Sequence, residues 1–168
     1  MKVYYKTIIC LVAFCIAFYF VMALIKNIKV NSSFKDEKIN ELCYSILDEN
    51  LNNIDRLIKS KINIDQIGEK NITPLMFAQI NKKPKSFKFL IEKGANMDLV
   101  VNEKVSALSL SAKNKDLFYL KTCIENGADI NLLHELSSRP LTFALNSRNY
   151  EAVILLLKNG ADPNLSDK

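Results

Sequence analysis

The pattern of apolar and polar residues repeats every 33 positions along residues 39–166. The segments TPLMFA (73–78), SALSLS (106–111) and RPLTFA (139–144) fall in register, and their apolar residues lie on one face at helical spacing. A short polar turn follows each segment, and then comes a second run rich in Leu, Ile and Phe that is closed by a glycine. The pattern predicts pairs of short helices, repeated along the chain.

The ends of the expected helices carry their own signals. Thr73 is an N-cap residue for the first helix of its copy, and Pro74 takes the first helical position, where its missing N–H costs nothing. Asp129 and Asp162 follow helix ends and are expected to bond local backbone. Each second helix is followed by a glycine, the residue that most readily takes a positive φ. These glycines are Gly94, Gly127 and Gly160.

The 33-residue period, the opening block TPLMFA and the closing block GAD-x-N, intact at 127–131 and 160–164, resemble the ankyrin-repeat family. The resemblance implies an all-α solenoid of helix-turn-helix units with β-hairpin-like fingers, whose helix pairs stack to bury their apolar faces. Arg139 replaces the capping Thr of the last copy. The His that follows T-P-L in the family is replaced in every copy, by Cys43, Met76, Ser109 and Thr142.

Three clear copies and one degenerate copy make up the expected repeat domain, residues 39–168. The degenerate first copy has lost its glycine but keeps the apolar spacing. A polar linker, residues 31–38, joins this domain to an N-terminal segment, residues 1–30, which is an anchor or a signal segment. The expected copies span residues 39–66, 72–99, 105–132 and 138–166.

Residues 7–25 form an apolar run of 19 residues without a charge. As a helix rising about 1.5 Å per residue, the run would span roughly 28 Å, close to the hydrocarbon core of a bilayer. Two interpretations stay open. A signal peptide would be cleaved near Ala23, leaving a periplasmic or secreted protein, whereas an uncleaved run would be a single-pass anchor. We favour the anchor, because the run is longer than a usual signal core and ends on Lys26 and Lys29.

The basic residues are distributed unevenly along the chain. Of the 23 Lys and Arg residues, four flank the apolar run, and the other 19 stand against 18 acidic residues. The repeat domain is therefore almost neutral, which argues against a nucleic-acid partner. The positive-inside count places the repeats in the cytoplasm, whereas a short head before the run favours export, so the side of the membrane stays open.

The sequence lacks the usual catalytic and metal-binding patterns. The single His134 lies beside Glu135 in a finger, where such a pair is typical of solvated surface. There is no C-x-x-C pair and no glycine-rich phosphate loop, so we expect no metal, no cofactor and no enzymatic activity. Cys43 and Cys123 are about 80 residues apart. We expect both to be buried free thiols, since a disulfide needs Cα atoms within about 7 Å.

The resemblance implies that a partner protein docks on the finger tips and on the exposed side of the first helices. These positions mix charges, amides and small apolar groups, which suits a protein rather than an enclosed small molecule. The basic stretch KKPK (82–85) falls at an inter-helix turn, which favours a solvated turn over a contact for an acidic partner. The implied partner-binding residues are Glu69, Lys70, Ile72, Ile80, Asn81, Asn102, Glu103, Val105, Lys113, Asn114, Glu135, Leu136, Ser138, Asn146 and Ser147.

Position 154, near the C-terminal end of the stack, interrupts a pattern of charges. Copy four has Ile154 where the earlier copies have Asp55, Lys88 and Lys121. Because the sequence stops soon after Gly160, we expect no fifth copy to cover this end. An apolar patch at the end of a solenoid is then expected to contact a partner or a second copy.

The sequence thus predicts a non-enzymatic protein–protein interaction module that is tethered to a membrane or exported across it. The leading hypothesis is a small immunity or inhibitor protein that neutralises a partner toxin or enzyme. The alternative is a membrane-anchored scaffold or adaptor that recruits a cytosolic protein.

Overall fold

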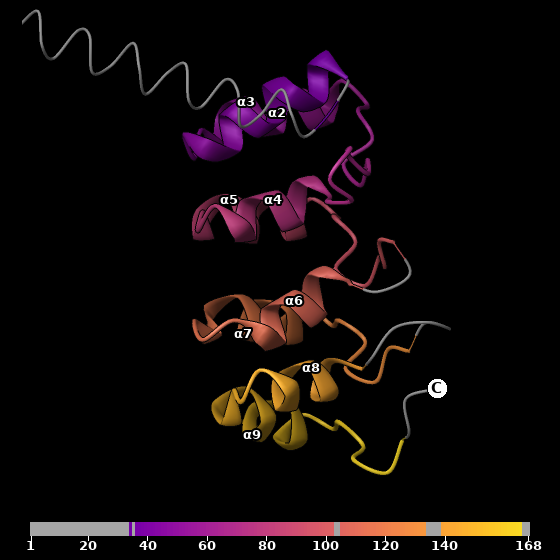
Figure 1. The fold of residues 1–168 in the computed structure, drawn as a ribbon. Coiled ribbons are helices and arrows are strands. Elements are labelled where there is room, and N and C mark those ends of the chain that lie inside the picture. Colours follow the sequence, from indigo (N-terminus) through magenta and orange to yellow (C-terminus); the bar gives the residue numbers. More distant parts are fainter. Residues whose placement is uncertain (1–33, 35, 103–104, 134–138, 166–168) are drawn as a thin grey trace, which may run out of the picture.

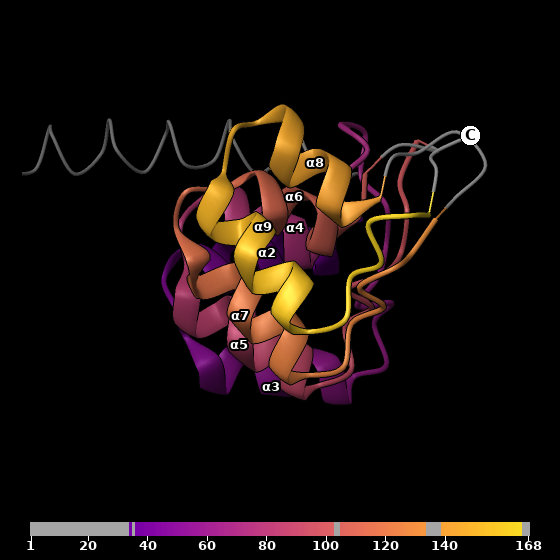
Figure 2. The ribbon, with the colours of Figure 1, turned by 90° about the horizontal axis from the view of Figure 1, so that it is seen from below.

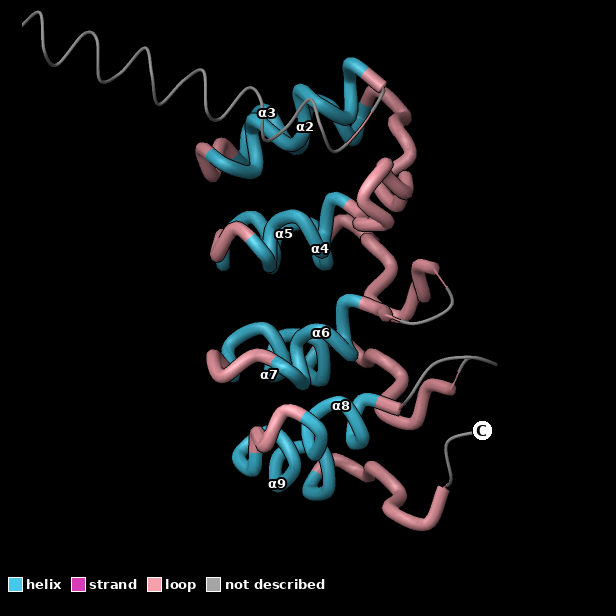
Figure 3. The backbone as a smooth tube through the Cα atoms, in the orientation of Figure 1, coloured by secondary structure: helices cyan, strands magenta, loops and turns pink. Residues whose placement is uncertain are grey.

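A computed structural model describes residues 34, 36–102, 105–133 and 139–165, and within them it confirms the all-α solenoid (Figure 1). The four helix pairs stack one on the next, and the loops that join the pairs project on one side (Figure 3). The pairs are α2 (Glu37–Leu47) with α3 (Leu51–Lys59), α4 (Pro74–Ile80) with α5 (Pro84–Glu92), α6 (Ala107–Lys113) with α7 (Leu117–Glu125), and α8 (Pro140–Asn146) with α9 (Tyr150–Lys158).

The helices begin where the sequence places their caps. The Thr73 side chain accepts a hydrogen bond from the Met76 N–H at 3.2 Å, with Pro74 in the first turn of α4. Ser106 caps α6 in the same way. Arg139 makes no side-chain cap bond at the start of α8, as its replacement of the capping Thr predicts.

The segment predicted as a linker, residues 31–38, belongs in part to the repeat domain. Asp36 caps α2 by accepting from the Lys38 and Ile39 N–H groups at 2.8 and 3.2 Å. Phe34 is buried, and its ring packs edge-on against Phe77 with centroids 6.4 Å apart. Phe34 and Asp36 therefore contact the repeat domain, and α2 begins at Glu37, two residues before the expected start of that domain.

Two columns of buried side chains run through the stack at the 33-residue interval. The first helices contribute Leu42, Leu75, Leu108 and Leu141. The second helices contribute Leu57, Leu90, Cys123 and Leu156. Full burial of one such aliphatic side chain stabilises the fold by about 1.5–3 kcal/mol. The repeat period is thus the period of the core.

Hydrogen bonds between neighbouring copies form a second periodic feature, on the loop side of the stack. In each, a side-chain oxygen of one copy accepts from a backbone N–H of the next. The bonds run from the Asn96 N–H to Asp65 Oδ1 at 2.9 Å, from the Asp129 N–H to Asp98 Oδ2 at 3.0 Å, and from the Asp162 N–H to Asn131 Oδ1 at 2.9 Å. These bonds fix the loops relative to one another.

The fingers are less strand-like than expected. Within the described ranges no β-strand forms, and one isolated antiparallel bridge joins Val101 to Val105. In the preceding finger the Gly68 N–H donates to the Ile72 carbonyl at 2.9 Å. The expectation of β-hairpin-like fingers is therefore corrected, in the described ranges, to turns held by single backbone pairs.

Asp129 and Asp162 bond local backbone as predicted. Their Oδ1 atoms accept from the Asn131 and Asn164 N–H groups at 3.0 and 2.9 Å. Cys43 and Cys123 are buried free thiols, which confirms the prediction for both. No helix in the described part is long and apolar enough to cross a bilayer, and the run at residues 7–25 lies outside that part.

Candidate functional site

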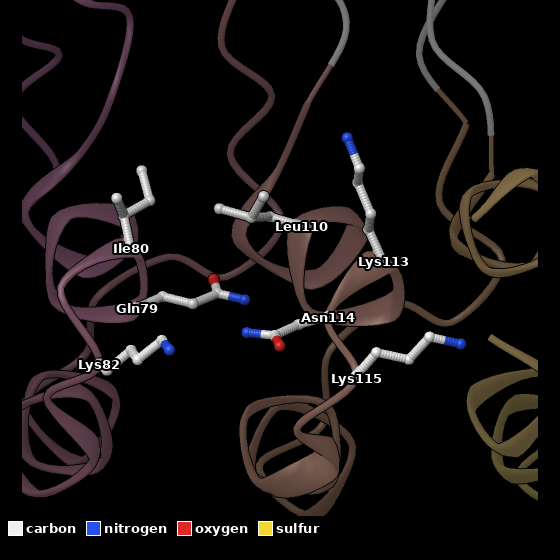
Figure 4. Close-up of a pocket in the computed structure, with 7 residues that line it drawn as sticks. All are labelled: Gln79, Ile80, Lys82, Leu110, Lys113, Asn114 and Lys115. Atoms are coloured by element: carbon white, nitrogen blue, oxygen red, sulfur yellow. The ribbon is translucent and has the colours of Figure 1, made fainter. Parts of the chain in front are cut away.

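A groove lies between α4 and α6, on the face formed by the first helices. Its volume is about 340 Å³. Figure 4 shows Gln79 reaching from α4 toward α6, with Ile80 on α4 and Leu110 and Lys113 on α6. We call it the lysine groove, and it is lined by Gln79, Ile80, Lys82, Leu110, Lys113, Asn114 and Lys115.

The end of α4 positions the first wall of the groove. α4 ends at Ile80, and Asn81 is its C-cap, with its amide nitrogen donating to the Phe77 carbonyl at 2.7 Å. Lys82 then takes a left-handed backbone conformation with φ 54°. The turn returns the chain into α5 and leaves the Ile80 and Lys82 side chains exposed.

A buried hydrogen bond fixes the floor of the groove. Gln79 Nε2 donates to Ser111 Oγ at 2.9 Å, and Ser111 Oγ donates to the Ala107 carbonyl at 2.8 Å. Both side chains are buried, so the bond is shielded from water and ties α4 to α6. The spacing of the two walls is therefore set by the fold and does not depend on a partner.

The groove combines an apolar surface with positive charge. Ile80 and Leu110 supply apolar atoms, while Lys82, Lys113 and Lys115 are exposed at its edges. No acidic residue is among the described residues that line the groove. The positive charge of these lysines attracts anionic groups of a partner to the edges of the groove.

Lys115 also connects this site to the last copy. Its Nζ atom donates to the Arg148 carbonyl at 2.8 Å. The Asn149 amide nitrogen, which comes from the start of α9, donates to the Asn114 carbonyl at 2.7 Å. The far wall of the groove is therefore held by copy four, which leaves Lys82 and Lys113 as its freer charges.

The structure brings three of the implied partner-binding residues together in the groove: Ile80, Lys113 and Asn114. Asn81 and Ser147 instead use their side chains to cap their own helices. Val105 forms the bridge to Val101, and Ile72 is half-buried. The exposed positions outside the groove are Glu69, Lys70, Asn102 and Asn146. Glu103, Glu135, Leu136 and Ser138 lie outside the described residues, as does His134.

Sequence reasoning missed four residues of the groove: Gln79, Lys82, Leu110 and Lys115. A signal for two of them was present, since Lys82 and Lys115 are 33 residues apart and occupy the same turn in successive copies. The KKPK stretch was interpreted as a solvated turn. Its first lysine is exposed and lines the groove.

The cysteines and acidic residues present no reactive centre in the described region. Burial raises the pKa of the Cys123 thiol to about 12 and raises that of Cys43 still further. A thiol needs its thiolate form to act as a nucleophile or a metal ligand, and burial disfavours that form. Among the described residues, no group of three or more His, Cys, Asp and Glu side chains could hold a metal ion.

Stacked helix pairs with loops projecting on one side define a helical-repeat solenoid. Residues 75–167, more than half of the chain, match the family model described as ankyrin repeats in three copies, so the chain belongs to the ankyrin-repeat family. Ankyrin repeats generally bind other proteins and are not catalytic, and this chain is accordingly a protein–protein interaction module. None of the curated proteins compared with it matches the chain.

Proposed function

We propose that the lysine groove binds an acidic segment of a partner protein. The observation that carries the proposal is an apolar surface, formed by Ile80 and Leu110, with three exposed lysines at its edges. An extended acidic segment can place an apolar side chain against Ile80 and Leu110, and its carboxylates beside the lysines. The groove is open along the lysines, so it suits a polypeptide better than an enclosed small molecule.

The proposal is tested by capture of the native partner with full-length protein in detergent. The variant carries Lys82→Glu and Lys113→Glu, which reverse two charges of the groove. The control carries Lys88→Glu and Lys121→Glu, two exposed lysines of the second helices. We expect the groove variant to lose the captured protein and the control to keep it. Equal capture by both variants overturns the proposal.

We also propose that residues 7–25 anchor the protein as a single membrane-spanning helix. The support is an uncharged run of 19 residues flanked by lysines. Burial of apolar surface is not screened by salt, so the full-length protein should stay with membranes at high salt. A soluble species that begins at Leu24 would show instead that the run is a cleaved signal.

Within this frame, the finer function that we propose is inhibition of a partner toxin or enzyme by the repeats. A rigid groove that covers a surface of the partner can block that surface. The alternative role, a scaffold for a cytosolic protein, is favoured by the excess of lysines after the run. A reporter fused after Lys168 shows which side of the membrane holds the repeats. An external position is compatible with the exported inhibitor, and a cytosolic position with the scaffold.

A further inference from the structure

The last copy leaves an apolar surface uncovered by any described residue. Of the eight large hydrophobic residues that are exposed in the described ranges, five lie between positions 145 and 165. Figure 2 looks along the stack onto this end, with α8 and α9 in front. The five residues, which we call the end face, are Leu145, Tyr150, Ile154, Leu157 and Leu165.

Part of the end face corresponds to the surface that, in each earlier copy, packs against the next copy. Leu145 is exposed, whereas the residues at its position in the other copies are buried, and these are Ile46, Gln79 and Ala112. Leu157 is likewise exposed, whereas Ile91 at the same position in copy two is buried. At Leu145 and Leu157 the end face therefore corresponds to surface that the stack covers in earlier copies, whereas Ile154 takes the place of a charged residue.

Three residues of the end face form a stripe on α9. An α-helix has 3.6 residues per turn, so Tyr150, Ile154 and Leu157 lie on one side of the helix. Glu151 and Lys158 are seven residues apart and fall together along one edge of that stripe. The Cα atoms of Glu151 and Lys158 are about 10.5 Å apart along the helix axis, which is too far for the two side chains to pair within one helix.

We propose that the end face binds a second copy of this chain, with the two α9 helices antiparallel about a twofold axis at Ile154. Ile154 is the central residue of α9 (Tyr150–Lys158) and is 53% exposed. A twofold interface brings the same patch of both copies together. The two Ile154 side chains then meet at the axis, and Tyr150 of each copy lies against the far end of the other stripe.

The charges at the edge of the stripe favour a second copy over another occupant. The twofold axis reverses the helix direction but keeps the edge on the same side. Glu151 of one copy thus lies beside Lys158 of the other, and this contact occurs twice. The acidic residue is in the first turn of α9 and the basic residue in its last, so the charge pattern is complementary to itself.

The test is sedimentation of the full-length protein in density-matched detergent over a range of concentrations. We expect the mass to rise from one chain toward two. Glu151→Lys or Lys158→Glu alone should weaken association by about tenfold, because each change places like charges together twice. The double variant E151K/K158E should restore association, since opposite charges again face each other. Ile154→Lys should abolish it.

A matched control is Lys88→Glu, which makes the same change of charge as Lys158→Glu on an exposed position of copy two. It should leave association unchanged. A chain that stays monomeric at all concentrations overturns the proposal, and a different occupant then covers the end face. The proposal is also overturned if neither single charge change weakens association, or if the double variant fails to restore it.

Discussion

At the scale of single residues, the left-handed backbone positions distinguish the first copy from the others. Gly94, Gly127 and Gly160 end the second helices with φ of 91°, 81° and 96°. Lys61 occupies the same place in copy one, with φ 61°. This conformation strains a residue that has a Cβ atom but not a glycine. Copy one therefore keeps the turn without its glycine, at a cost in stability.

Lys61→Gly should raise the free energy of unfolding by about 1 kcal/mol, since it removes this strain. Gly94→Ala should lower it by a similar amount, because a Cβ there would meet no atom within 4 Å and would add backbone strain alone. Urea denaturation followed by circular dichroism measures both changes. A loss of stability in Lys61→Gly would show that contacts of the lysine side chain stabilise the fold by more than the backbone strain destabilises it.

Asp98 is a second residue with an unfavourable feature. Its Oδ2 atom accepts from the Asp129 N–H, but its Oδ1 atom is buried without a hydrogen-bond partner among the described residues. Burial raises the pKa of the Asp98 carboxyl, and the charge of Asp129 adds to the rise, while the hydrogen bond from Asp129 offsets part of it. The equivalent Asn131 instead uses its Nδ2 atom to donate to the Gly160 carbonyl at 3.0 Å.

Asp98→Asn should therefore stabilise the fold at pH 7, by about 1 kcal/mol if the new amide gains the equivalent bond. The folded-state pKa of Asp98 is raised, so its contribution to stability falls as pH rises from the unfolded pKa through the folded one. The gain from the substitution should be larger at pH 7 than at pH 3. Denaturation at both pH values measures it, and an equal gain contradicts the burial of charge as the cause.

At the scale of elements, the caps explain why such short helices form at fixed places. α4 and α6 each have seven residues and a side-chain cap bond, whereas α8 has seven residues without one. Isolated helices of this length are unstable in water, so caps and packing must hold them.

Thr73→Ala and Ser106→Ala should each lower the free energy of unfolding by about 1 kcal/mol through loss of the cap. Arg139→Ala removes no cap bond from α8, so its effect should not include this loss. Thermal denaturation of the three variants provides the comparison. If Thr73→Ser keeps full stability while Thr73→Ala loses it, the hydroxyl is responsible. Equal stability of all variants would contradict the cap bonds.

The elements were predictable from the sequence to the extent that their signals are local. Thr73 with Pro74, and the three terminating glycines, mark helix ends within a few residues. The start of α2 was missed because Asp36 and Phe34 lie in a polar stretch before the repeat pattern begins. The groove was only partly predicted, because Gln79 and Leu110 become neighbours through the packing of two copies. The buried hydrogen bond from Gln79 to Ser111 holds these two copies together.

At the scale of the whole molecule, one continuous core joins all four copies. Both described cysteines lie in it, Cys43 in copy one and Cys123 in copy three. They are fully buried, and their pKa values are raised by burial. Access to either thiol therefore requires opening of the stack.

A chain with Cys10→Ser and Cys15→Ser should react with a thiol reagent at pH 8 at least about 100-fold more slowly when folded than in urea. The cause is twofold, since the folded thiols are both shielded and held in the protonated form. The difference in reaction rate is measured from the absorbance of the group that the thiol reagent releases. Fast reaction of the folded chain would show that the described core opens readily.

The groove is the part of the molecule to which we assign the partner. A photoreactive amino acid in place of Lys113 lies within it, and one in place of Lys121 lies on α7 and does not line it. After irradiation in native cells, mass spectrometry identifies the crosslinked protein and the peptide attached. We expect a strong adduct from position 113 alone, on a peptide rich in Asp and Glu. Equal adducts from both positions, or an attached peptide without acidic residues, would contradict a lysine groove that binds an acidic segment.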